Sequence, residues 1–344
     1  MINYFIKHRL KQQQFRNREI TPEEFDAAGN ILFSVFSRYG DGIIAFKIIN
    51  EFIARFPEKT YFLLTSHQLR PYAEALVDGR VQVGSVRKRN PVQLVKTIKR
   101  LKDADIDVGL NPWGSRGESE FFLTFGKRFY TFSSIKFKIT DNLYFRVRRY
   151  LGLPEPEERE TGFALSEPVR RVLLSPFSSD VRKSVPPADV VPLLSWLDRR
   201  FPEARVTIAL GQEEADRVKD AAAQSLFIFG KSEPSSRQFL ELLKESDLFV
   251  GVDAGPLHLA DALGKPCIGL FGPTPPETIM DAKSHILALR SEKLQGIFCA
   301  VQSCPMPHCL RALFQDDPEA HISTCSQGLK EERGLCRFLH PEGG

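Results

Sequence analysis

The chain has 344 residues, of which 42% are hydrophobic and 26% charged, and its formal net charge is +4. A chain of this length is long enough for about two domains. It has no run of 18 apolar residues, which excludes a membrane-spanning helix. The segment 1–20 lacks the apolar core and the small-residue cleavage site of a secretory signal, so we expect a cytoplasmic protein.

The first half of the chain alternates between short apolar runs and amphipathic segments. We expect strands at Ile31–Ser37, Thr60–Thr65, Val81–Gly84, Ile106–Leu110 and Phe129–Phe132. We expect helices near Ile43–Phe56, Gln68–Val77, Pro91–Leu101 and Ser119–Phe125. This alternation predicts a parallel, doubly wound sheet.

A polar turn follows the first expected strand. Its residues 37–42 read Ser-Arg-Tyr-Gly-Asp-Gly, and the glycines on both sides of Asp41 let the backbone turn tightly. Asp41 then lies at the mouth of the loop, where it serves either as a helix cap or as a reactive carboxylate. The chain has no GxGxxG fingerprint, which disfavours a nicotinamide enzyme.

A stretch rich in Pro and Glu, around residues 151–168, indicates a linker. We therefore predict a first domain at 1–155, a linker at 156–168 and a second domain at 169–344. Strands are expected there at Arg171–Ser175, Arg205–Leu210, Leu226–Phe229, Leu248–Val252 and Cys267–Phe271. Helices are expected near Ala188–Arg199, Glu213–Ala223, Ser236–Lys244 and Pro256–Leu263. Two such sheets facing across a cleft would bind a ligand at the carboxyl ends of their strands.

The most informative stretch is Leu248–Thr274, which reads as a strand, a tight turn, a helix, a second strand and a Gly-Pro turn. Free amides at the start of such a helix attract a phosphate, and the second loop, around Gly272 and Thr274, adds donors. An ordinary βαβ unit with Asp253 as a helix cap is the alternative.

Residues 253–260 (DAGPLHLA), 263–266 (LGKP) and 270–274 (LFGPT) resemble the donor-sugar motif of the ADP-heptose:lipopolysaccharide heptosyltransferases, glycosyltransferase family nine. The strand and loop at 174–179 (LSPFSS) and the lysine of 182–186 (RKSVP) are similar to another motif of that family. Two positions depart from the pattern. Ala254 replaces the usual Thr or Ser, and Val185 replaces the usual Trp.

The resemblance implies a fold of two Rossmann-like domains, called GT-B, and an inverting transfer that needs no cofactor. It makes Asp41 the general base, and Lys183 the group that stabilises the leaving diphosphate. Asp253 is expected to orient loop amides and donor hydroxyls. The implied donor-binding residues are Ser178, Ser179, Lys183, Glu213 or Glu214, Asp253, Ala254, Gly255, His258, Gly272 and Thr274.

Cysteines gather near the C-terminus, where Cys304, Cys309, Cys325 and Cys336 could bring four thiolates to a structural Zn or Fe site, with a spacing looser than that of a paired CxxC framework. Buried or surface thiols are the alternative. Autotransporter heptosyltransferases, which this tail also resembles, carry a four-cysteine iron finger.

Positive charge is concentrated in the first half, where residues 1–153 hold 26 Lys and Arg against 15 Asp and Glu. This half should attract an anionic partner, and because no nucleic-acid motif accompanies it we expect an anionic glycolipid. The basic, amphipathic segment Met1–Ile20 is expected to contact the membrane surface, with packing on its own domain as the alternative.

These features predict an enzyme that moves a heptose or similar sugar from a nucleotide-diphosphate sugar to a lipopolysaccharide-core or other glycan acceptor. Two alternatives stay open. One is a heptosyltransferase with a protein acceptor, and the other is a catalytically silent carbohydrate-binding protein on the same fold.

Overall fold

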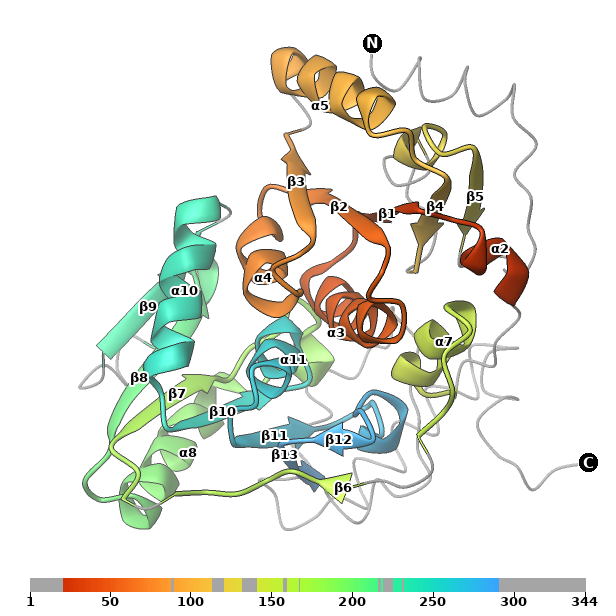
Figure 1. Ribbon diagram of the computed structural model, residues 1–344. Coiled ribbons are helices and arrows are strands. Elements are labelled where there is room, and N and C mark those ends of the chain that lie inside the picture. The colour runs from red at the N-terminus through yellow and green to blue at the C-terminus, as the bar shows by residue number, and fades with distance from the viewer. Residues whose placement is uncertain are drawn as a thin grey trace, which may run out of the picture. The chain divides into compact units, whose positions relative to one another are not determined.

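The computed structural model describes residues 21–87, 90–112, 121–131, 141–156, 160–166, 168–215, 218, 225–230 and 232–290. The chain divides into two compact units (Figure 1). Unit 1 comprises residues 1–157 and 231–240, and unit 2 comprises residues 158–230 and 241–344. Residues 231–240, which the sequence places in the second domain, therefore cluster with the first.

Unit 1 is built on a parallel sheet with strand order β3-β2-β1-β4-β5. Its strands are β1 (Asn30–Val35), β2 (Thr60–Ser66), β3 (Gln82–Val86), β4 (Val108–Asn111) and β5 (Arg128–Thr131). Its helices are α2 (Pro22–Asp26), α3 (Tyr39–Arg55), α4 (Arg70–Leu76), α5 (Pro91–Asp103) and α7 (Leu143–Tyr150). The register Asn30↔Thr60 begins the β1–β2 pair.

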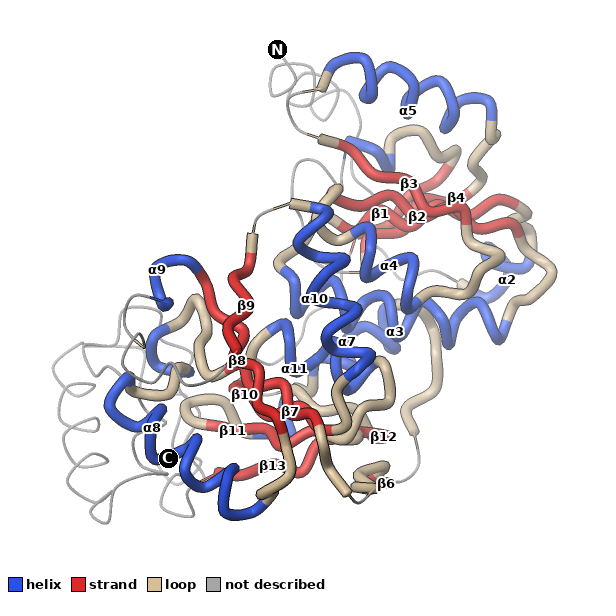
Figure 2. The backbone as a smooth tube through the Cα atoms, turned by 90° about the vertical axis from the view of Figure 1, so that its left-hand side faces the viewer, coloured by secondary structure: helices blue, strands red, loops and turns tan. Residues whose placement is uncertain are grey.

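Helices cover both faces of the unit 1 sheet (Figure 2). On one face, Phe33 of β1 packs edge-on against Phe52 of α3, with ring centroids 5.7 Å apart. On the other face, Leu32 of β1 joins a cluster that includes Leu94 and Ile98 of α5. Successive side chains of a strand point to opposite faces, so the apolar run of β1 supplies both cores.

Unit 2 contains a parallel sheet of six strands in the order β13-β11-β10-β7-β8-β9. These strands are β7 (Arg171–Ser175), β8 (Arg205–Gly211), β9 (Ser225–Phe229), β10 (Leu248–Val252), β11 (Cys267–Phe271) and β13 (Ile286–Arg290). A small second sheet pairs β6 (Glu160–Thr161) with β12 (Lys283–Ser284). The helical segments are α8 (Pro187–Arg200), α9 (Gln212–Ala215), α10 (Glu233–Glu245), α11 (Gly255–Ala262) and the 3₁₀ turns η2 (Val181–Lys183) and η4 (Pro276–Thr278).

The two parallel α/β sheets predicted from the sequence are confirmed. Strands β7, β10 and β11 have the predicted bounds, and the other predicted strands differ by one or two residues at their ends. Helix α11 stops where the sequence predicts, because Gly264 takes a left-handed φ of 71°. Its amide donates to the backbone carbonyl oxygen of Asp261 at 2.9 Å.

Several elements differ from the prediction. Helix α3 starts at Tyr39 instead of Ile43, and α9 is only four residues long in the described part of the chain. Helix α7 and strands β6, β12 and β13 were not predicted. Of the helix expected near Ser119–Phe125, residues 121–123 are helical, and part of its range lies outside the described residues.

Candidate functional site

The loop between β10 and α11 forms the centre of the candidate site in unit 2. Asp253 follows the last residue of β10, and Ala254 is the N-cap of α11 in an extended conformation, with φ −151°. The Asp253 side chain is 5% exposed, so the carboxylate is buried and needs charged or hydrogen-bonding partners.

The Asp253 carboxylate has two cationic or polar partners. Lys183 Nζ donates to Oδ2, and His258 Nε2 lies 3.5 Å from Oδ1. Burial by itself would raise the pKa of Asp253, but the His258 hydrogen bond and the charge of Lys183 outweigh it and lower that pKa to about 2. The carboxyl is therefore ionised at neutral pH. Its partners are these side chains and not the loop amides that we expected.

His258 is buried together with Asp253, and its side chain is only 7% exposed. With Nε2 directed at Asp253, Nδ1 is buried without a hydrogen-bond partner among the described residues. Leaving a buried polar atom unpaired is costly, so such an atom needs an explanation. A polar group of a ligand would satisfy Nδ1.

The start of α11 offers fewer free amides than the sequence suggested. The amides of Leu257 and His258 already donate to the carbonyl oxygen of Ala254, at 3.0 and 3.4 Å, and Pro256 has no N–H. Gly255 is left as the only first-turn amide with no acceptor among the described residues. The helix start therefore offers one free first-turn amide among the described residues, and the nearby charged donor of the predicted set is Lys183.

Parallel pairing of β10 with β7 brings Lys183 to Asp253. Gly251 lies beside Ser175, so the loops after both strands leave the same edge of the sheet. The loop after β7 continues into η2, where the Asp180 side chain accepts from the Arg182 amide at 3.1 Å. This turn fixes the backbone that carries Lys183.

The two predicted serines of this loop differ in their surroundings. Ser178 Oγ accepts from the amide of Asp180 at 3.2 Å, and the Ser178 amide donates to Ser184 Oγ at 2.9 Å. Ser179 is exposed. Ser178 thus has a role in holding the loop, whereas Ser179 is open to solvent. Val185 is fully buried in the unit 2 core, which explains why an apolar residue stands there.

Gly272 and Thr274 lie after β11, the strand next to β10, and both are buried. Arg290 Nε donates to the carbonyl oxygen of Gly272 at 3.2 Å. Sequence reasoning missed Arg290. Because it ends the unpredicted strand β13, only the short apolar run before it, residues 286–289, could have indicated its place at this edge.

Glu213 and Glu214 lie in the short helix α9, after β8. Glu214 Oε2 accepts from the amide of Gly211 at 2.5 Å, so this carboxylate caps its own loop. The side chain of Glu213 is outside the described part of the structure.

Asp41 lies in unit 1, in the first turn of α3. It is therefore inside the helix, and Arg38 occupies the N-cap, so the sequence expectation of a loop residue is corrected. Gly42, the next residue, packs closely: an added Cβ would lie 3.0 Å from both Leu69 Cδ1 and Ser37 Oγ.

A cavity of about 600 Å³, the basic cavity, lies beside the carboxyl ends of β2 and β3. Its lining residues are His67, Arg70, Ser85, Arg87, Asn90, Val92, Gln93, Lys96 and Glu233. Arg70 pairs with Glu74 at 2.6 Å, whereas Arg87 and Lys96 have no carboxylate partner in the described ranges. Burial, together with the charge of Arg87, lowers the pKa of His67. The cavity suits an anion.

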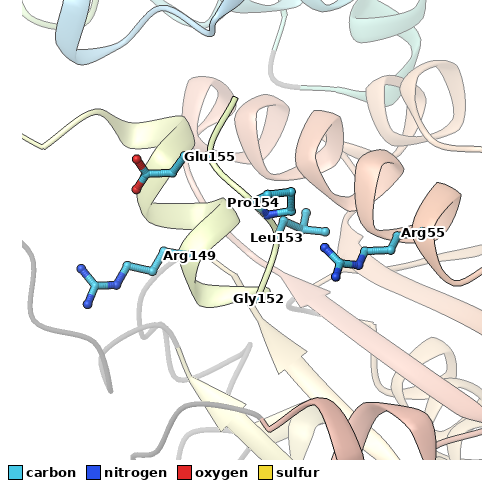
Figure 3. A pocket seen from close by; sticks show the side chains of 6 residues that line it. All are labelled: Arg55, Arg149, Gly152, Leu153, Pro154 and Glu155. Carbon is cyan, nitrogen blue, oxygen red and sulfur yellow. The ribbon is translucent and has the colours of Figure 1, made fainter. Parts of the chain in front are cut away.

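A second cavity of unit 1, of about 510 Å³, contains none of the predicted site residues (Figure 3). It is lined by Arg55, Arg149, Gly152, Leu153, Pro154 and Glu155. The four cysteines of the predicted metal site, Cys304, Cys309, Cys325 and Cys336, lie outside the described residues. Within those residues, no group of three or more His, Cys, Asp or Glu side chains is placed to hold a metal ion.

Asp253, His258 and the partly exposed Lys183 lie at the carboxyl edge of a parallel sheet, which is where open α/β sheets bind their ligands. Comparison with known proteins indicates which α/β proteins this chain is similar to. Residues 206–310 match the family model of glycosyltransferase family 9 (heptosyltransferase). Lipopolysaccharide heptosyltransferase 1 of Campylobacter coli is 30% identical over 116 residues, which are 32% of this chain and 34% of that relative. The matched segment thus spans about a third of the relative.

Solved structures show the same fold over most of the chain. The heptosyltransferase WaaC of E. coli with ADP has a TM-score of 0.61 at 14% identity and covers 87% of this chain and 99% of its own. The ADP-heptose lps heptosyltransferase II of E. coli has a TM-score of 0.60 at 15% identity, with 89% and 99% covered. A family 9 glycosyl transferase of Veillonella parvula has a TM-score of 0.57 at 14% identity, with 88% and 98% covered. The fold is that of the GT-B heptosyltransferases, and the predicted resemblance to glycosyltransferase family nine is confirmed.

Proposed function

We propose that the protein is a glycosyltransferase that moves a heptose or similar sugar from a nucleotide-diphosphate sugar to a lipopolysaccharide-core or other glycan acceptor. The observation that carries this proposal is the buried Asp253 carboxylate with Lys183 and His258 at the carboxyl edge of the unit 2 sheet. Asp253 and His258 lie within the segment that matches family 9. The Campylobacter coli relative, a lipopolysaccharide heptosyltransferase, supports the substrate class.

Lys183 is the group that would receive the donor diphosphate. Its side chain is 26% exposed, whereas the partner carboxylate is 5% exposed, so Nζ can turn toward a ligand while Asp253 stays in place. The His258 interaction continues to compensate the buried carboxylate. A lysine suits a leaving diphosphate because its compact charge follows the negative charge as it grows. In this proposal no divalent cation is needed.

Asp41 would accept the proton of the acceptor hydroxyl. As that proton leaves, the hydroxyl oxygen bonds to the anomeric carbon, and the bond from this carbon to the diphosphate breaks. The nucleotide diphosphate departs with the electron pair. Attack on the face opposite the leaving group inverts the anomeric configuration. The first-turn position of Asp41 favours the ionised form that a base requires, because a helix N-terminus stabilises negative charge.

The basic cavity supports an anionic acceptor. Arg87 and Lys96 bring positive charge to a hollow of about 600 Å³, enough space for one or two sugar rings with their acidic substituents. Arginine is suited to phosphate and carboxylate groups because its planar donors bind two oxygens at once. We therefore propose a phosphorylated or carboxylated glycolipid as the acceptor.

A ligand screen followed by a transfer assay tests the function. ADP and ADP-heptose should raise the melting temperature of the wild-type protein, and UDP and UDP-sugars serve as the comparison. Transfer to lipopolysaccharide core should then release ADP, persist in EDTA and give a product with inverted anomeric configuration by NMR. Donor binding without transfer to any glycan or surface-protein acceptor would favour a silent binding protein. Transfer to protein alone would favour a protein heptosyltransferase.

A further inference from the structure

Helix α5 has an outer face on which apolar and basic side chains alternate. Val92 and Val95 are 63% and 66% exposed, which is unusual for valines on a folded helix. The opposite face is fully used, because Leu94 and Ile98 pack on the unit 1 core and Leu101 is buried there. Helix α5 is therefore packed on its own unit, and a missing contact with the core does not explain the exposure of the two valines.

The same outer face carries cations. Val95, Lys96 and Lys99 follow Val92 by three, four and seven residues, which places all four on one side of the helix. Arg100 and Lys102 extend the charge toward the helix end. None of these cations has a carboxylate partner in the part of the chain that the structure describes. In α5 itself, Asp103 is the sole acidic residue.

Exposed apolar side chains surrounded by flexible cations suit a membrane surface. The valines can enter the interfacial layer while the lysines keep their ammonium groups among anionic headgroups. Nucleic acid would use the cations but not the valines, and α5 carries no aromatic side chain on which a base could stack. Among the described residues, no helix is long and apolar enough to cross a membrane.

The outer face of α5 also adjoins the basic cavity of unit 1. The helix lies along the outer side of the unit, next to the edge strand β3 (Figures 1 and 2). Val92 and Lys96 belong both to its exposed surface and to the lining of the basic cavity. A membrane in contact with α5 would therefore meet the rim of that cavity.

We infer that the outer face of α5 docks unit 1 on an anionic lipid bilayer, with Val92 and Val95 entering the headgroup layer and Lys96, Lys99, Arg100 and Lys102 binding anionic headgroups. This goes beyond the proposed transfer reaction and does not depend on it. The docked surface places the basic cavity at the level where the headgroup of a lipid-anchored molecule is found.

Vesicle co-sedimentation of the full-length protein tests the docking. The vesicles contain phosphatidylcholine with 30% or without phosphatidylglycerol, and neither donor nor acceptor is present. The test variant is Val95→Glu with Lys99→Glu, two positions that do not line the cavity. Val191→Glu with Arg199→Glu on α8 is the control, because it also changes an exposed valine and an exposed cation and alters the net charge equally.

Wild type and control should bind the anionic vesicles, and binding should weaken as salt rises. The α5 variant should bind at least about 20-fold more weakly, since each unit of positive charge near such a surface contributes roughly fivefold, the local charge falls by three units and an apolar contact is lost. If the Glu variant fails to fold, Val95→Ser with Lys99→Gln should still lose about fivefold or more.

Three results would overturn the docking. The first is that the wild type does not bind the anionic vesicles. The second is that the folded α5 variant binds them as tightly as the wild type. The third is that the α8 control variant loses as much vesicle binding as the α5 variant. A loss confined to oligonucleotide binding, with vesicle binding unchanged, would assign the face to nucleic acid instead.

Discussion

Lys183 Nζ donates to the Asp253 carboxylate, so a single ion pair joins two loops of unit 2 that are 70 residues apart in the sequence. The pair exists because the parallel strands before the two loops are neighbours. It links donor recognition to stability, because the proposed diphosphate ligand and Asp253 both require the same ammonium group.

The first prediction concerns the energy of this pair. A double-mutant cycle with Lys183→Met and Asp253→Asn should give a coupling of about 1–3 kcal/mol in the free energy of unfolding, because the carboxylate is buried. Urea denaturation at pH 7 measures it. The control cycle, Lys244→Met with Glu241→Gln, involves an exposed pair and should give about 0.5 kcal/mol or less. Equal couplings in both cycles would show that the Lys183 pair is an ordinary surface contact.

The second prediction concerns pH. The pKa of Asp253 is about 2 in the folded protein against an ordinary value of 3.8, so the folded state favours the ionised form. This contribution is complete above about pH 4 and disappears as the pH falls toward 2. It amounts to about 2 kcal/mol at neutral pH. In Asp253→Asn, the free energy of unfolding should therefore fall less between pH 5 and 2.5 than in the wild type. Parallel curves for the two proteins would contradict the assigned pKa.

The third prediction concerns His258. Replacement by alanine should weaken binding of ADP and the sugar donor by roughly 10- to 150-fold, the usual value of a hydrogen bond to a charged group. Calorimetric titration measures this loss. From the sequence alone, a histidine about one turn into a helix is expected to be an exposed polar side chain whose loss changes the apo stability little. Because His258 is buried against Asp253, we now expect alanine to cost about 1–3 kcal/mol of stability as well.

The variant His258→Gln separates these two effects, since an amide can still donate to Asp253. It should recover much of the stability lost in His258→Ala. Its donor affinity should stay low if Nδ1 is the atom that contacts the ligand. Wild-type affinity in both variants would place the donor elsewhere.

The sequence was sufficient to predict the sheets of both units. Their strands are continuous apolar runs such as Leu248–Val252 and Cys267–Phe271, and the Gly264 stop between them fixes the length of α11. Strand β13 was missed because two of its residues, Leu287 and Leu289, are exposed at the sheet edge and do not mark a core strand. Helix α7, LYFRVRRY, was missed because three arginines interrupt its apolar residues, so that it resembles a basic loop.

The site was predicted as a set of residues but not as a set of contacts. Motif resemblance selected Lys183, Asp253 and His258, and the structure brings them together. Their pairing follows from the β7–β10 register, which no local pattern contains. The same limit explains Arg290, because its contact with Gly272 depends on which strands are neighbours in the sheet.

The fourth prediction tests the proposed base. Asp41→Asn should lower turnover by about 10²- to 10⁴-fold, the usual effect of losing a general base, and leave the Kd for the donor nearly unchanged. Asp189→Asn is the matched control, because Asp189 also lies in the first turn of a long helix. It should retain wild-type turnover. If Asp41→Asn kept near-normal turnover with the true acceptor, the residue would serve only the helix dipole of α3.

The last prediction assigns the basic cavity to the acceptor. Arg87→Gln should raise the KM for an anionic glycan acceptor by about 10-fold or more and leave the donor Kd unchanged, because an arginine bound to a phosphate or carboxylate contributes at least 1.5 kcal/mol, roughly tenfold. The control is Arg149→Gln, which removes an arginine from the other cavity of unit 1 (Figure 3). Acceptor kinetics at saturating donor measure both variants. Loss of donor affinity in Arg87→Gln would move this residue to the donor site, and an equal rise in KM for both variants would show that only the overall positive charge of unit 1 matters.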